Sequence, residues 1–313
     1  MKNLKKIKGD ASFRQFYRKK DKDLSSIIVF AKKDKLKNLI IYDSINRLLN
    51  QNKILAPILY NENYKKNYIE IQDFGDETIF KILKKKKYNK YNIFKKIIEI
   101  LNQIQLIKST KTKNFKQKEY KLPKYDMEIL VKEANLFCDW YAKKELNKKD
   151  VKIFIIKFKA IVKKLTLELK LKNNVFVHRD FHVSNLMLVN NQIGLIDSQD
   201  ALIGNRAYDL ASLIDDVRLK TPKLLKKRIY NLYINSQKKL NKNKFKNDFE
   251  ILSILRNLKI IGIFTRLAIR DKKKNYLRLI PYAWELINLR INENKIFNDL
   301  KYLLTQNFNK KIR

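Results

Sequence analysis

The sequence predicts an α+β fold with two lobes: a small, antiparallel β-rich lobe over residues 1–72 and a large, mainly helical lobe over residues 73–313. Short runs with strand-like alternation, bounded by charged turns, occupy the first part. From Ile79 onward, apolar residues recur at the three- and four-residue spacing of helices. The chain contains only 5 glycines and 4 prolines, so few positions interrupt the helices of the second lobe.

The small lobe is predicted to hold two pairs of strands and one helix. The first pair flanks a charged turn at residues 19–23, which is typical of a hairpin. The helix is expected over residues 36–49, because its apolar side chains recur at helical spacing. The predicted strands are residues 16–18, 27–30, 56–60 and 68–71.

The large lobe is predicted to be a series of helices with one inserted β-loop. The inserted loop has a turn at residues 190–192 between two short apolar runs. Its predicted strands are residues 175–177, 186–189 and 193–196. The predicted helices are residues 91–107, 125–146, 150–170, 207–218, 222–240, 247–269 and 282–291.

The charge of the chain is extreme, at +40 from 71 Lys plus Arg against 31 Asp plus Glu. Hydrophobic residues nevertheless make up 45% of the chain, which excludes a disordered basic tail. Most of the positive charge is lysine and accompanies abundant Asn, Ile, Phe and Tyr, all of which have A/T-rich codons. We attribute the charge to base composition, and expect no nucleic-acid partner because no motif of a nucleic-acid-binding fold accompanies it.

Cysteine content and hydropathy favour a cytoplasmic protein. The single cysteine, Cys138, excludes an internal disulfide and is expected to be a small buried residue. No apolar stretch approaches the ~18–20 residues that a membrane helix needs. The first residues lack the apolar core of a signal peptide, so no membrane insertion is expected.

One segment departs from the basic composition of the rest. No lysine occurs between Lys172 and Lys220, and residues 175–216 contain six aspartates against two arginines. Both histidines of the chain, His178 and His182, lie in this segment. An acidic segment in a strongly basic chain indicates a site for a metal ion.

The same segment carries a motif whose spacing suits phosphoryl transfer. Residues 178–185 have the form H-x-D-x-x-x-x-N, and Asp197 follows at the end of an apolar strand. Asp180 can orient an attacking hydroxyl and accept its proton, while Asn185 and Asp197 offer oxygen ligands for Mg²⁺. Zinc binding by the two histidines is disfavoured, because no third ligand is evident.

With these residues, the sequence resembles the aminoglycoside phosphotransferase superfamily, whose members have the two-lobed fold of the protein kinases. Within it, the sequence is similar to the bacterial cell-wall sugar kinases, which phosphorylate N-acetylmuramate and N-acetylglucosamine at the anomeric hydroxyl. The matching segments are residues 9–18, 71–76, 125–126, 133–141, 178–185, 196–201, 208–213, 256–267 and 276–281.

The resemblance implies roles for individual residues. Asp180 would be the catalytic base, Asn185 and Asp197 the Mg²⁺ ligands, and Asp209 a buried carboxylate that braces the catalytic loop. His178 would brace the same loop. Ser12 and the neighbouring main-chain amides would cover the ATP phosphates, and the main chain of residues 70–73 would hold adenine. The residues expected to bind ATP are therefore Gly9, Asp10, Ala11, Ser12, Arg14, Glu70 and Asp73.

Departures from the family's pattern leave the phosphate-binding cation open. Gly9 is the only glycine where the kinases have three, and the strand at residues 27–30 lacks the lysine that usually binds the phosphates. The helix that faces it has Asp43 where a glutamate is expected, and Ser198 replaces the usual aromatic residue after Asp197. The candidate cations are Arg14, Arg18 and Lys32.

The sugar-binding residues are less sharply defined. An aromatic residue in a helix can stack on a sugar ring or belong to the core, acidic side chains can accept hydrogen bonds from sugar hydroxyls, and an arginine can bind a lactyl carboxylate. The candidates are Asp126, Glu133, Trp140, Asp200 and Arg266.

The expected activity is ATP- and Mg²⁺-dependent phosphorylation of the anomeric hydroxyl of a small-molecule sugar, N-acetylmuramate or N-acetylglucosamine. The resemblance implies that the product enters peptidoglycan recycling. Two alternatives remain: a kinase for another alcohol, of aminoglycoside, choline or homoserine type, or a kinase-like binding module without catalysis.

Overall fold

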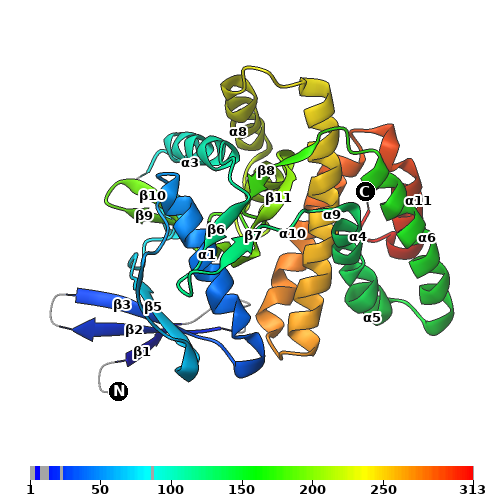
Figure 1. The fold of residues 1–313 in the computed structure, drawn as a ribbon. Helices are drawn as coiled ribbons and strands as arrows, with labels where there is room; N and C mark the ends of the chain where they lie inside the picture. Colours follow the sequence, from blue (N-terminus) through cyan, green and yellow to red (C-terminus); the bar gives the residue numbers. More distant parts are fainter. Residues whose placement is uncertain (1–3, 8–13, 22–23, 86–87, 313) are drawn as a thin grey trace. The chain divides into compact units, whose positions relative to one another are not determined.

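The computed structural model describes residues 4–7, 14–21, 24–85 and 88–312. The predicted α+β class is confirmed, since a five-stranded antiparallel sheet comes first and a mainly helical part follows (Figure 1). The chain divides into two compact units. The first contains Met1–Pro123 and Val175–Ile203, and the second contains Lys124–Asn174 and Gly204–Arg313.

The sheet of the first unit has the strand order β1-β2-β3-β5-β4, with antiparallel neighbours throughout. The predicted hairpin is confirmed as β2 and β3, and Arg18 lies opposite Ile27 in its register. The predicted strand at residues 56–60 begins only at Leu59, because the Ala56 amide and the Pro57 carbonyl bond to side chains instead of a strand. The strands are β1 Leu4–Ile7, β2 Gln15–Asp21, β3 Leu24–Phe30, β4 Leu59–Asn63 and β5 Tyr68–Gln72.

Helix α1, Lys37–Gln51, confirms the helix expected at residues 36–49. Its buried face packs on alternate residues of β3 and β5, so that a small apolar core forms between helix and sheet. The buried residues of this core are Ile27, Val29, Ala31, Leu39, Tyr42, Ile69 and Ile71.

The rest of the first unit includes the inserted β-loop. Its hairpin of β9, Leu186–Val189, and β10, Gln192–Leu195, turns at Asn190 and Asn191, which both have positive φ as a two-residue turn requires. A lysine-rich pair, β6 Lys111–Lys113 and β7 Glu119–Lys121, lacked the apolar alternation by which sequence reasoning finds strands. The helices here are α2 Ile79–Lys84 and α3 Lys90–Gln105.

The second unit is mainly helical. The predicted helix at residues 125–146 is broken into α4, a π-helical turn at Phe137–Ala142 and α5. Strands β8, Asn173–Val177, and β11, Leu202–Asn205, pair with each other, and the boundary between the units falls within both. The helices are α4 Met127–Ala134, α5 Lys143–Glu145, α6 Lys148–Leu167, α7 Ala207–Ile214, α8 Lys223–Ser236, α9 Lys242–Ile269, α10 Ile280–Ile291 and α11 Asn298–Phe308. In the two units together, short 3₁₀ helices span Lys33–Lys35, Tyr64–Lys66, Ser198–Asp200, Lys274–Leu279 and Lys295–Phe297.

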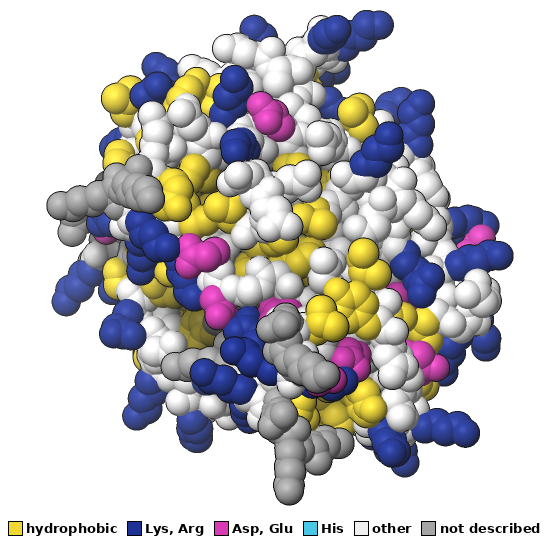
Figure 2. All heavy atoms as spheres, turned by 90° about the vertical axis from the view of Figure 1, so that its left-hand side faces the viewer, with side chains coloured by type: hydrophobic (Ala, Val, Ile, Leu, Met, Phe, Trp, Pro, Cys, Tyr) yellow, Lys and Arg dark blue, Asp and Glu magenta, His cyan; other side chains and the backbone are white. Residues whose placement is uncertain are grey.

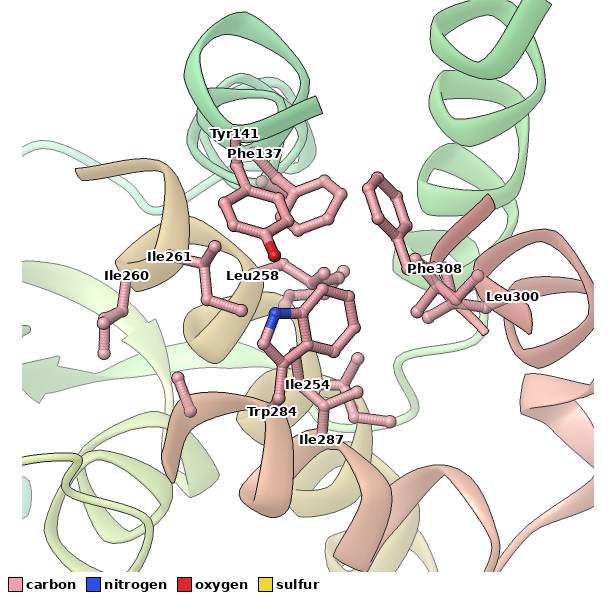
Figure 3. Packing of buried hydrophobic residues seen from close by; sticks show 14 of the residues in the cluster. Phe137, Tyr141, Ile254, Leu258, Ile260, Ile261, Trp284, Ile287, Leu300 and Phe308 are labelled. Atoms are coloured by element: carbon pink, nitrogen blue, oxygen red, sulfur yellow. The ribbon is translucent and has the colours of Figure 1, made fainter. Parts of the chain in front are cut away.

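The core of the second unit is rich in aromatic side chains. Phe137 contacts Tyr141, Trp284 and Phe308 with ring centroids 5.2, 5.7 and 5.6 Å apart (Figure 3). Cys138 is fully buried beside them, as expected. Tyr141 therefore belongs to the core, and its neighbour Trp140 is half-buried.

Helix α9 runs through this core and is buried on most of its circumference. At Gly262 the helix approaches the main chain of Leu136 and Phe137, where the π-helical turn begins. A Cβ atom at Gly262 would lie 2.6 Å from the amide nitrogen of Phe137 and still closer to the carbonyl of Leu136. The packing of these two elements therefore depends on a residue without a side chain.

On one face of the molecule the positive charge is spread out and does not gather in a single patch (Figure 2). On the face drawn in Figure 2, Lys and Arg side chains are scattered among neutral and hydrophobic surface. Across the described part of the chain, every helix is too short or too polar to span a membrane.

Candidate active site

The loop that carries Asp180 and Asn185 follows β8 and is held by its own main chain. The amide of His182 donates to the Asp180 carbonyl at 3.0 Å, and the amide of Asn185 donates to the His182 carbonyl at 2.8 Å. Arg179 adopts a positive φ of 74°, which turns the chain just before Asp180. These bonds fix the loop, and the Asp180 side chain takes no part in them.

Asn185 joins this loop to the segment of Asp197. Its Nδ2 donates to the Asp180 carbonyl at 3.0 Å, so the amide oxygen on the other side of the group is the atom that can ligate a cation. Its own carbonyl accepts from the amide of Ile196 at 3.1 Å. The residue next to Asp197 is thereby tied to Asn185, and the two candidate ligands are brought together.

His178 lies at the base of the loop and is fully buried. Burial lowers the pKa of its imidazole, which favours the neutral form. Its ring packs edge-on against Phe181 with centroids 6.2 Å apart. This environment suits a residue that braces the loop.

Asp197 occupies a left-handed conformation, with φ 64° and ψ 37°, at the end of β10. Its side chain is 36% exposed and forms an ion pair with Arg14 at the start of β2. Arg14 is only 5% exposed, and its Nη1 donates to Oε1 of Gln199 at 2.7 Å. Its guanidinium also lies 5.5 and 5.3 Å from the ring centroids of Phe16 and Tyr42.

Arg18, the second candidate cation, is bound by two carboxylates. Its Nη2 donates to Asp73 at 3.0 Å and its Nη1 donates to Asp76 at 2.9 Å. The hydrogen bonds that Arg18 donates to Asp76 and Asp73 raise its pKa above its ordinary value. Burial alone would raise the pKa of Asp73, but hydrogen bonds from Arg18, Ser25 and the Gly75 amide hold it below its ordinary value.

Lys32, the third candidate cation, lies exposed beside the first 3₁₀ segment. Asp43, on the helix that would supply a partner for a strand lysine, is buried and pairs with Arg47 at 2.9 Å. Burial raises the pKa of Asp43 despite that partner. Helix α1 instead contacts the segment that follows Asp197 through Asn46, whose Oδ1 accepts from Ser198 Oγ at 2.6 Å.

Only some of the residues predicted to bind the nucleotide are among those that the structure describes. Gly9, Asp10, Ala11 and Ser12 lie outside them. Glu70 accepts from Ser26 Oγ at 2.6 Å and from Lys19 Nζ at 3.1 Å. Burial raises the pKa of Glu70, but these two hydrogen bonds outweigh burial and lower it.

The remaining predicted residues divide between the units. Asp200, in the first unit, is exposed and lies 3.8 Å from Arg179. Asp126 caps α4 by accepting from the amide of Ile129 at 2.9 Å, and Glu133 is buried beside Tyr125 and Lys259. The others, all in the second unit, are Asp209, fully buried in α7, half-buried Trp140 and half-buried Arg266 near the end of α9.

Three polar residues of the site were not predicted to contribute to it: Asn46, Ser198 and Gln199. Ser198 and Gln199 lie in the matching segment of residues 196–201, directly after Asp197, and that place in the segment is the signal that could have found them. The described residues include no group of three His, Cys, Asp or Glu side chains that could hold a metal ion. A cation at Asn185 and Asp197 would have two protein oxygens and would need the rest of its ligands from a substrate.

The sequence of this chain is similar to those of known phosphotransferases. A family model described as "APH: Phosphotransferase enzyme family" matches residues 3–234. The N-acetylmuramate/N-acetylglucosamine kinase of Neisseria meningitidis serogroup B is 29% identical over 283 residues, which cover 87% of this chain and 81% of that protein.

Solved structures show the same fold at low identity. A choline/ethanolamine kinase family protein from Mesorhizobium loti matches with a TM-score of 0.64 and 9% identity, covering 97% of this chain and 92% of that chain. A spectinomycin phosphotransferase in complex with ADP and spectinomycin matches with a TM-score of 0.58 and 16% identity. The match covers 96% of this chain and 92% of that chain.

Proposed function

Because this chain belongs to the APH phosphotransferase enzyme family, we propose that it transfers the γ-phosphate of ATP to the anomeric hydroxyl of N-acetylmuramate or N-acetylglucosamine. The observation that carries the phosphotransfer is the hydrogen-bonded arrangement that links Asp180, Asn185 and Asp197. The sugar acceptor is supported by the 29% identical Neisseria kinase. The sugar phosphate would then enter peptidoglycan recycling.

In this proposal Asp180 is the catalytic base. Its carboxylate takes no part in the bonds that hold its loop, so it is available to orient the acceptor hydroxyl and accept its proton. The main-chain bonds on either side fix its position, which is the larger part of catalysis in phosphoryl transfer.

Asn185 and Asp197 would hold Mg²⁺. One amide oxygen and one half-exposed carboxylate are hard oxygen donors, and Mg²⁺ binds such pairs together with phosphate oxygens. When bound, Mg²⁺ neutralises the phosphate charge that phosphoryl transfer concentrates. The left-handed turn at Asp197 and its tie to Asn185 set the direction of both donors.

Among the three candidate cations, we take Arg14 as the one that serves the nucleotide site. Arg18 is already bound by Asp73 and Asp76, and Lys32 is exposed. Arg14 alone is buried against Asp197, where its positive charge orients the proposed metal ligand. It would act as a positioning residue for the Mg²⁺–ATP complex.

Adenine is expected at the main chain that follows β5. Within β5, Glu70 and Gln72 are paired with neighbouring strands, and the Gln72 amide donates to the Ile58 carbonyl at 2.8 Å. The main chain at Asp73 lies just past the strand and outside this pairing. It is therefore the part of residues 70–73 best suited to bind adenine.

The test is Mg²⁺-dependent ADP release with five acceptors: N-acetylmuramate, N-acetylglucosamine, kanamycin, choline and homoserine. Asp180→Asn protein serves as the blank. Turnover with an N-acetyl sugar, lost when the anomeric carbon is reduced to the alditol, supports the proposal. Turnover with another alcohol alone contradicts the sugar acceptor, and no turnover with any of the five contradicts the proposed function.

A further inference from the structure

The first residue after β5, Asp73, is held by its side chain and not by its main chain. Its carboxylate is 3% exposed and accepts four hydrogen bonds. Two come from Arg18, at 2.5 and 3.0 Å, and the others come from Ser25 Oγ and the Gly75 amide, both at 2.8 Å. Within the described residues, the main-chain amide and carbonyl of Asp73 form no hydrogen bond. Asp73 therefore keeps one main-chain donor and one main-chain acceptor for a ligand.

Arg18 joins this segment to the sheet. It lies in β2, opposite Ile27 of β3. The guanidinium that binds Asp73 also donates to both oxygens of Asp76, at 2.9 and 3.1 Å. One side chain thus holds two carboxylates, which lie on either side of Gly75 and its positive φ of 78°. Without this cation the two negative charges would repel each other, and the buried Asp73 carboxylate would have no ion-pair partner among the described residues.

A fixed donor and acceptor can distinguish purine bases by the groups at positions 6 and 1 of the ring. Adenine has an amino donor at position 6 and a ring acceptor at N1. Guanine and hypoxanthine have a carbonyl acceptor at position 6 and an N–H donor at N1. In the pose that suits adenine, these two bases would set donor against donor and acceptor against acceptor. The discrimination therefore depends on how firmly the main chain of Asp73 is held.

We propose that Arg18 is the positioning residue by which this protein selects adenine nucleotides over those of guanine and hypoxanthine. The inference rests on the nucleotide half of the proposed function, in which the main chain at Asp73 binds adenine. Arg18 acts through the Asp73 carboxylate and does not contact the base. All three nitrogens of its guanidinium donate to Asp73 and Asp76, so it is engaged in holding this segment and is not available to the phosphates.

The test is titration of the protein with ADP, GDP and inosine diphosphate in the presence of Mg²⁺, followed by calorimetry. Binding needs no acceptor, so the result does not depend on which sugar the protein uses. We expect wild-type protein to bind ADP about tenfold or more tightly than the other two, the discrimination of one donor–acceptor pair. Arg18→Met should weaken ADP binding about tenfold and hardly change the other two, which gain nothing from Asp73 in the wild-type protein.

Lys20→Met is the matched control, because it removes an exposed cation two residues further along β2. It should leave all three affinities unchanged. Arg18→Lys keeps the charge but loses the fork, so it should retain part of the preference for ADP. It also carries the test if Arg18→Met protein does not fold. Equal losses for the three nucleotides, or wild-type protein without a preference for ADP, overturn the inference.

Failure of the proposed function would look different. If wild-type protein prefers ADP and the Arg18 variants lose that preference, the inference stands even where no acceptor supports ADP release. Wild-type protein that binds none of the three nucleotides overturns the proposed function, and this inference with it.

Discussion

Arg14 and Asp197 form an ion pair although 183 positions separate them in the sequence. The guanidinium is buried between Asp197 and the rings of Phe16 and Tyr42, so the pair has little freedom to move. The carboxylate proposed to bind Mg²⁺ therefore has a positive partner built into the fold. Protein kinases place a lysine on the third strand, where it pairs with a helix glutamate beside the phosphates, and β3 of this chain has no lysine.

Replacing Arg14 should weaken nucleotide binding more than it affects the acceptor. Arg14→Met removes the partner that orients Asp197, so we expect KM for ATP to rise about tenfold or more, with partial rescue in Arg14→Lys. Titration of ADP release against ATP and Mg²⁺ measures the effect. Lys33→Met, which removes an exposed cation of the same unit, is the control. Unchanged KM values in Arg14→Met would refute the positioning role.

Replacing Asp180 should remove turnover without disturbing its loop. Asn185 bonds to the main-chain carbonyl of residue 180, so Asp180→Asn keeps that bond. We expect kcat to fall about 10²- to 10⁴-fold, the range for a lost general base. ATP affinity and the melting temperature should not change. A loss of ATP affinity equal to the loss of kcat would show that Asp180 is structural.

A buried cluster around Asp215 should make stability depend on acid pH. Burial raises the pKa of Asp215, but Lys226 at 2.9 Å, Arg290 at 3.0 Å and Ser253 at 2.6 Å outweigh burial and hold it well below its ordinary value. A folded pKa below the unfolded one stabilises the protein above about pH 4, and this contribution is lost as the pH falls below that.

Urea unfolding from neutral to acid pH measures this dependence. The difference in unfolding free energy between wild-type protein and Asp215→Asn should shrink as the pH falls below about 4. Asp34→Asn, which removes an exposed carboxylate, is the control. A difference that stays constant across the titration would show that Asp215 contributes nothing through its charge.

Gly262→Ala should destabilise the protein although alanine favours helices. The added methyl group would meet the main chain of Leu136 and Phe137, which cannot rotate away as a side chain can. We expect a net loss of about 1–3 kcal/mol in unfolding free energy, against a gain of up to ~1 kcal/mol from helix propensity. Urea denaturation measures it. Asn243→Ala, at an exposed position of the same helix, should change it by less than ~0.5 kcal/mol. A stabilised Gly262→Ala protein would contradict the close approach.

Local patterns predicted much of the fold. Alternation and turn residues located β2, β3, β9 and β10, and helical spacing located α1, because each pattern depends on neighbours in the chain. The π-helical turn at Phe137–Ala142 was missed because its apolar residues fit ordinary helical spacing almost as well. Strands β6 and β7 were missed because their exposed lysines do not alternate with apolar residues.

The candidate site was predictable only where it lies in one stretch of chain. The spacing of Asp180, Asn185 and Asp197 pointed to one site, and the main-chain bonds at Asn185 bring them together. The cation remained open among Arg14, Arg18 and Lys32, because their partners lie far away in the sequence. Asp73 and Asp76, more than fifty positions from Arg18, bind it, and no local pattern reveals that pairing.

The first unit consists of two separate segments of the chain, so its two parts leave the ribosome at different times. Translation releases the amino-terminal sheet first, then Lys124–Asn174 of the other unit, and only afterwards Val175–Ile203. The bonds that close the first unit span this interval: the Phe80 amide donates to the Val183 carbonyl at 2.9 Å, and the Leu195 amide donates to the Leu55 carbonyl at 2.8 Å. A nascent chain therefore completes this unit only after residue 203 has emerged, and Asp180 and Asp197, which are proposed to serve phosphotransfer, lie in the segment that completes it.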